Sequence, residues 1–114
     1  MLTPVPISRE RLEEALQVAR SIADGSIEVI VGARKMAAIH LYSGHVQQPT
    51  DEDYALLLAI DSETEHLPIS DARRHWSPAA LERKAPEVAE AETFFRERGV
   101  AAARSFIARH ETGA

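Results

Sequence analysis

Glu63 and His66 have the residue types and the spacing of metal ligands. Residues i and i+3 share one face of a helix, and two Glu-x-x-His pairs with two further glutamates build the di-metal site of carboxylate helical bundles. The chain has one such pair, because none of its other histidines follows a glutamate at this spacing. We therefore interpret the pair mainly as surface or network residues. A metal-dependent or acid/base enzyme using Asp61, Glu63 and His66 is the alternative.

The same segment holds the residue types of a nucleophile, a base and an orienting acid. Ser62 and His66 lie at i and i+4, with Asp61 and Glu65 beside them. Catalytic groups of this kind usually come from separate elements, since a helix fixes the directions of neighbouring side chains. The chain also has no Gly-x-Ser-x-Gly elbow, phosphate loop or dinucleotide fingerprint. These observations favour a protein without catalytic residues, bound metal or cofactor.

Carboxylates follow the apolar run at 54–60, and the basic cluster Arg73-Arg74-His75-Trp76 comes after them. If this run is helical, the acids at 61, 63 and 65 crowd its C-terminal end, where the dipole disfavours each by about 0.3–1 kcal/mol. Arginine pairs strongly with carboxylates, so we expect Arg73 or Arg74 to turn back and clamp these acids. The alternative is a ligand or partner site in the same segment. The residues of this binding or structural network are Asp61, Ser62, Glu63, Glu65, His66, Arg73, Arg74 and Trp76.

Composition narrows the class of protein. The chain has 114 residues, 45% hydrophobic and 27% charged, which fits one globular domain over residues 1–114. It has no cysteine, which excludes disulfides and cysteine metal sites. The net charge of −5 argues against nucleic-acid and anionic-membrane binding, and the six carboxylates at 51–66, without lysine or arginine, favour a basic protein partner. With neither a signal-peptide pattern nor a membrane-length apolar run, we expect a cytoplasmic protein.

Helical spacing of the apolar residues predicts an all-α fold. The run at 54–60 is apolar on nearly every side, which indicates a central, buried helix; a buried strand is the alternative. Ser26 is expected to cap the second helix, Gly32 indicates a close helix crossing, and Pro86 should kink or divide the last helix. The result is a compact bundle of four to five helices. Its expected segments are an extended arm at 1–7, helices at 9–23, 27–42 and from about 51, a helical turn at 70–76, a last helix from 78 and a disordered tail at 111–114.

Two adjacent aromatic residues stand in the last predicted helix. Phe94 and Phe95 point about 100° apart on a helix, so they cannot both face one narrow core stripe. Packing of two helices on two sides of the last helix is the favoured explanation. Contact with a second subunit is the other, which leaves a homodimer open.

Several of these segments carry a resemblance. The run Ile-Asp-Ser-Glu-Thr-Glu-His-Leu-Pro at 60–68, followed by Arg73 and Arg74, Trp76 and Ser77-Pro78, resembles a motif of small bacterial proteins of uncharacterised function. The pieces at 24–27 and 32–34 are similar to the upstream part of such chains, so the resemblance covers most of residues 24–95. It implies no activity and transfers no catalytic residue.

Together these patterns favour a small cytoplasmic protein-interaction module without enzymatic activity. An inhibitor of the immunity or antitoxin type is one concrete version, because the acids at 51–53 offer a surface to a basic toxin. The enzyme that uses Asp61, Glu63 and His66 is the competing hypothesis.

Overall fold

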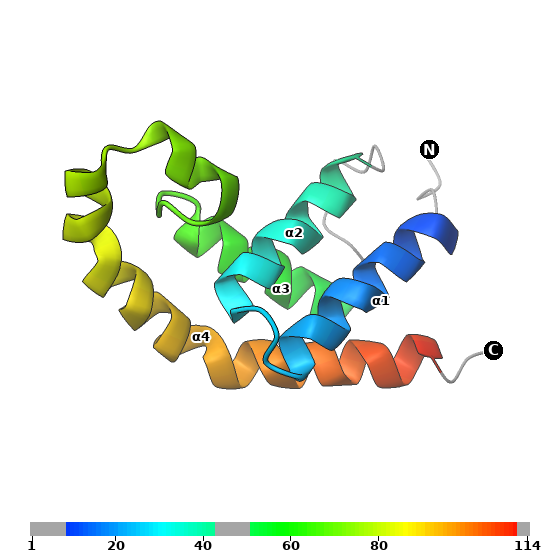
Figure 1. Ribbon diagram of the computed structural model, residues 1–114. Coiled ribbons are helices and arrows are strands. Elements are labelled where there is room, and N and C mark those ends of the chain that lie inside the picture. Colours follow the sequence, from blue (N-terminus) through cyan, green and yellow to red (C-terminus); the bar gives the residue numbers. More distant parts are fainter. Residues whose placement is uncertain (1–8, 43–50, 112–114) are drawn as a thin grey trace, which may run out of the picture.

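Four α-helices and one 3-10 helix make up the described part of the chain (Figure 1). The computed structural model describes residues 9–42 and 51–111, and these ranges contain no strand, which confirms the predicted all-α class. The predicted arm at 1–7, the expected tail after residue 111 and the loop at 43–50 lie outside the described residues. The elements are α1 (Arg9–Ala23), α2 (Val29–Tyr42), α3 (Glu52–Thr64), η1 (Ser70–His75) and α4 (Pro78–Glu111).

Two of the helices hold the bundle together. α2 and α4 each pack on the other three α-helices, and Figure 1 shows the end of α1 crossing the second half of α4. Pro86 does not divide α4, which continues as one helix; Figure 1 shows a change of direction between its first half and its second half. Glu111, expected in the tail, is the last residue of α4 and forms an ion pair with Arg20 at 3.4 Å.

Glycines allow two of these helix contacts to be unusually close. A Cβ atom at Gly32 of α2 would collide with the side chain of Ile22 from α1, as the predicted close crossing requires. A Cβ atom at Gly99 of α4 would collide with Val29, whose branched side chain has little freedom to move away. Both contacts surround the start of α2, which is therefore packed tightly from two sides.

The N-terminus of α2 is capped by a residue distant in sequence. Glu92 of α4 is only 3% exposed, and its carboxylate accepts hydrogen bonds from the backbone N–H groups of Val29 and Ile30, both at 2.9 Å. Arg96 adds an ion pair to the same carboxylate at 3.5 Å. The predicted cap at Ser26 is wrong, because the Ser26 hydroxyl and N–H both donate to Asp24. Glu92 thus satisfies two of the donors that the first turn leaves free.

α3 is a helix and not the strand that its apolar run also permitted. Asp51 is its N-cap and accepts from the N–H groups of Asp53 and Tyr54 at 2.9 and 3.0 Å. Its buried face carries Tyr54, Leu57 and Ile60, and the Tyr54 hydroxyl donates to the Met36 carbonyl of α2 at 2.7 Å. α3 is therefore fixed against α2 by a polar bond as well as by apolar packing.

Glu92→Ala should lower the free energy of unfolding by about 2–4 kcal/mol, because two buried N–H groups lose their acceptor. The matched control is Glu90→Ala, which removes an exposed glutamate of the same helix and should change stability by less than about 0.5 kcal/mol. Urea denaturation followed by circular dichroism measures both. Equal effects of the two substitutions would show that the cap contributes nothing specific.

Candidate functional site

Arg34 of α2 binds the C-terminal end of α3. Its guanidinium forms an ion pair with Asp61 at 3.1 Å and donates to the Thr64 carbonyl at 2.7 Å and the Leu67 carbonyl at 3.2 Å. These carbonyls belong to the last turn of α3 and the turn after it, where the helix leaves acceptors free. A cation at this end also offsets the dipole that disfavours the acids there.

The predicted arginine clamp therefore exists, but it is formed by a different residue. Arg73 and Arg74 of η1 are exposed, and Arg74 pairs with Asp71 of its own element at 3.7 Å. The expectation that either of them turns back to Asp61, Glu63 or Glu65 is wrong. The sequence does not indicate Arg34 as the partner of Asp61, because the two are 27 residues apart, whereas Arg73 and Arg74 follow the acids closely.

The structure separates the predicted network into three places. Asp61 faces Arg34, whereas Glu63 and His66 line a groove between α3 and the first half of α4. The remaining members are not in this groove: Ser62 and Glu65 are exposed, and Arg73, Arg74 and Trp76 belong to η1 or its end.

The groove, which we call the α3–α4 groove, has a volume of about 700 Å³. Much of its lining is apolar, with Leu67 from the turn after α3 and Phe94 and Phe95 from α4. Acidic residues from both sides join them, with Glu63 on α3 and Glu87 and Glu90 on α4. The further lining residues are Thr64, His66, Pro86, Ala89, Ala91 and Thr93.

A chain of polar contacts crosses the groove at one end. The His66 imidazole lies 3.4 Å from Glu87, and Lys84 pairs with the same carboxylate at 2.9 Å. The hydrogen bond from Lys84, and then that from His66, lower the pKa of Glu87. Glu87 is therefore already paired with Lys84 and His66. Glu63 and Glu90 supply the rest of the negative charge in the lining.

Phe94 is the most unusual residue of the groove, because it is a large apolar side chain that is 67% exposed. Its ring packs edge-on against that of Phe95, with 4.9 Å between centroids. The Arg98 guanidinium lies over Phe94 at 4.8 Å and over Phe95 at 5.3 Å. The favoured explanation, in which helices pack on both residues from two sides, is wrong for Phe94: Phe95 is partly buried against the core, and Phe94 faces solvent.

Among the described residues, Asp61, Glu63 and His66 of the alternative enzyme hypothesis do not come together in one site. Within residues 9–42 and 51–111, no group of three or more histidines, aspartates or glutamates lies close enough to hold a metal ion. Asp61 is bound to Arg34 instead of joining Glu63 and His66. Ser62 is exposed and Thr64, the other nearby hydroxyl, donates to the Ile60 carbonyl of its own helix at 2.8 Å.

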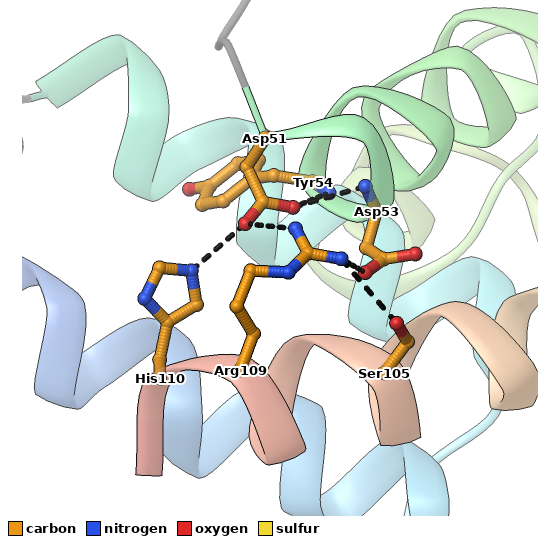
Figure 2. Close-up of polar contacts among 6 residues, drawn as sticks. All are labelled: Asp51, Asp53, Tyr54, Ser105, Arg109 and His110. Atoms are coloured by element: carbon orange, nitrogen blue, oxygen red, sulfur yellow. Dashed lines mark hydrogen bonds and ion pairs between the residues drawn. The ribbon is translucent and has the colours of Figure 1, made fainter. Parts of the chain in front are cut away.

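A second polar cluster joins the start of α3 to the end of α4 (Figure 2). Arg109 reaches from α4 to Asp51 at 2.8 Å and also bonds to Asp53 and Ser105. The His110 ring contacts the same oxygen of Asp51 at 2.8 Å. Since Asp51 is also the N-cap of α3, the cluster holds this helix end against the last turns of α4.

The electrostatics of this cluster favour its ionised form. Burial of Asp51 opposes ionisation, but the hydrogen bond from His110, the Tyr54 N–H and the charge of Arg109 outweigh it and lower the pKa of Asp51. The charge of Asp51 is the main cause that raises the pKa of Arg109. Asp51 and Asp53 are thus already paired with Arg109, and Asp51 also with His110. We interpret the cluster as a structural contact that holds the start of α3, more than as a site for a ligand.

No protein-family model, curated protein or solved structure matches this chain. The resemblance to small bacterial proteins thus stays a prediction. None of the described helices is long and apolar enough to cross a membrane.

Sequence reasoning missed the α4 side of the groove. Glu87, Glu90 and Phe94 lie at i, i+3 and i+7, so they share one face of α4. An aromatic residue on an otherwise acidic helix face was the available signal. Its significance depends on α3 ending opposite this face, which the sequence does not show.

Arg34→Gln should lower the free energy of unfolding by about 1–3 kcal/mol, because Asp61 and the carbonyls at the end of α3 lose a half-buried charged donor. The double substitution Arg73→Gln/Arg74→Gln is the control and should cost less than about 0.5 kcal/mol, since both side chains are exposed. Chemical denaturation gives both values. A larger loss of stability in the double variant would instead support pairing of Arg73 or Arg74 with the acids at the end of α3.

Asp51→Asn should flatten the loss of stability in acid. Because the pKa of folded Asp51 lies below the unfolded value of about 3.9, its ionised form stabilises the protein above about pH 4, and this contribution is lost as the pH falls through the folded pKa. Melting temperatures should fall more steeply for the wild type than for Asp51→Asn between about pH 4 and pH 2. Glu13→Gln, which removes an exposed carboxylate of α1, is the control. Parallel curves for the wild type and Asp51→Asn would contradict the assignment.

Proposed function

We propose that this protein is a non-enzymatic interaction module that binds a basic protein partner in the α3–α4 groove. The observation that carries the proposal is Phe94, which stands 67% exposed inside a groove with other apolar residues and several carboxylates. Aromatic side chains in such positions frequently supply much of the binding energy of protein interfaces. A partner that covers Phe94 removes its apolar surface from water.

The charge of the protein supports a basic partner. The net charge is −5, and Glu63 and Glu90 place negative charge on both sides of the groove. The surface expected at 51–53 contributes less, because Asp51 and Asp53 are both bonded to Arg109. An inhibitor of the immunity or antitoxin type, acting in the cytoplasm on a basic toxin, remains the concrete version of the proposal, with the groove in place of the acids at 51–53.

Phe94→Ala should abolish capture of the partner while leaving the fold intact, since an exposed ring contributes little to stability. Leu41→Ala is the matched control, because Leu41 of α2 is 68% exposed and is not among the residues that line the groove. Tagged wild type, Phe94→Ala and Leu41→Ala are used to capture proteins from native cells, and mass spectrometry quantifies what each retains. A partner should be recovered with the wild type and Leu41→Ala alone.

Two outcomes of this experiment would overturn the proposal. Equal recovery of the same proteins by all three forms would show that the groove is not the binding site. Recovery of no partner, together with turnover in a general hydrolase screen, would favour the enzyme hypothesis instead.

A further inference from the structure

We propose that the segment of the partner that occupies the α3–α4 groove is a cationic amphipathic helix. The inference rests on the proposed function, and it specifies the secondary structure, the charge and the length of what binds. Three features of the described residues carry it: the state of the backbone around the groove, the charges of its lining, and its length along α4.

The backbone around the groove favours a helix over an extended peptide. An extended peptide that binds by β-strand addition gains affinity by pairing its main chain with a free strand edge. The described residues contain no strand, and every α4 residue of the lining lies inside a helix. On the α3 side, the Thr64 and Leu67 carbonyls already accept hydrogen bonds from Arg34. A helix satisfies its own main chain, so it needs only side-chain contacts from such a surface.

The charged residues that line the groove favour an occupant with positive charge. Glu63 comes from α3 and Glu90 from α4, so a helix that lies between these two elements places one flank near each carboxylate. Lysine or arginine on both flanks complements this arrangement, whereas acidic flanks meet like charge. The Phe94 ring, about one turn after Glu90 on α4, is the contact for the apolar stripe of the bound helix.

The length of the groove determines how much of a helix it covers. Its α4 residues run from Pro86 to Phe95, nine steps of a helix, which is about 14 Å at 1.5 Å per residue. This length equals about two and a half turns, enough for three apolar residues at i, i+3 or i+4, and i+7 on the occupant.

The probe for this inference is a fluorescein-labelled synthetic peptide of about 14 residues, with leucines at i, i+3, i+4 and i+7 and lysines elsewhere. Fluorescence anisotropy with the full chain should show saturable one-to-one binding, and circular dichroism should show that the peptide becomes helical. Phe94→Ala should weaken binding about tenfold or more. A peptide with glutamate in place of each lysine, and one with two central prolines, should not bind.

A charge-matched pair of variants separates the groove from the overall negative charge. Glu63→Gln/Glu90→Gln removes the two carboxylates on the sides of the groove and should weaken binding about tenfold. Glu13→Gln/Glu52→Gln changes the net charge equally through exposed residues outside the groove, and should leave the Kd almost unchanged at about 0.15 M salt.

Each opposite result overturns a defined part of the inference. Equal binding of the proline peptide would identify an extended occupant, and equal binding of the glutamate peptide would exclude charge recognition. Equal weakening by both glutamine pairs would show attraction to the whole protein. Phe94-dependent self-association in analytical ultracentrifugation would identify a second copy of this chain as the occupant.

The inference and the proposed function fail separately. If native cells yield a partner that depends on Phe94 but the lysine peptide does not bind, the interaction module stands and the cationic helix is wrong. If the lysine peptide does not bind and no Phe94-dependent partner is recovered, both are wrong.

Discussion

The bundle depends on one buried carboxylate, that of Glu92. A helix whose first turn is buried must find acceptors for its free N–H groups, and α2 has none on the preceding segment, where Ser26 bonds to Asp24. Glu92 supplies both acceptors from α4 and so determines where α2 starts. The position of α2 in turn determines where Arg34 lies. Arg34 then holds the end of α3, so one capping contact makes the next one geometrically available.

The groove is a consequence of this series of caps. α3 is fixed at its start by Asp51 with Arg109 and His110, and at its end by Arg34. Its last turn is therefore held at a defined distance from the first half of α4, which changes direction along its length (Figure 1). Side chains such as Phe94 do not fill the space between them. The charged contacts of Glu92 and Arg34 thus hold the helices together. Glu63 and Glu90, which line the groove, take no part in these contacts.

Much of the fold followed from local patterns. The 3.6-residue spacing marked the apolar faces of α1 and α4. Ser77 caps α4 by accepting from the Ala80 N–H at 3.2 Å, and Gly25, with φ of 82°, follows the end of α1 at Ala23. These signals depend on residues within one turn of each other. The caps of α2 and of the end of α3 do not, because their partners lie about sixty and thirty residues away.

The candidate site shows the same division between local and distant information. Glu63 and His66 do line one groove, but His66 lies in the turn after Thr64, the last residue of α3, so a shared helix face is not the reason. The alternative hypothesis joined Asp61 to them, yet Asp61 stands two residues before Glu63, a rotation of about 200° on a helix, and so faces Arg34 instead. One signal for the long-range cap was present in the sequence: Glu92 interrupts the apolar stripe that contains Val88, Phe95 and Ala102. A charged residue in such a stripe is commonly paired in the interior.

The Glu92 cap also has a consequence for the order in which the chain acquires its structure. Sixty-three residues separate Val29 from the carboxylate that caps it. During synthesis, the sequence of α2 is complete long before residue 92 exists, so the first turn of α2 has only water to satisfy those two donors. Its stable start must await the middle of α4. We therefore expect α2 to reach its native, capped start only after the middle of α4 has been made.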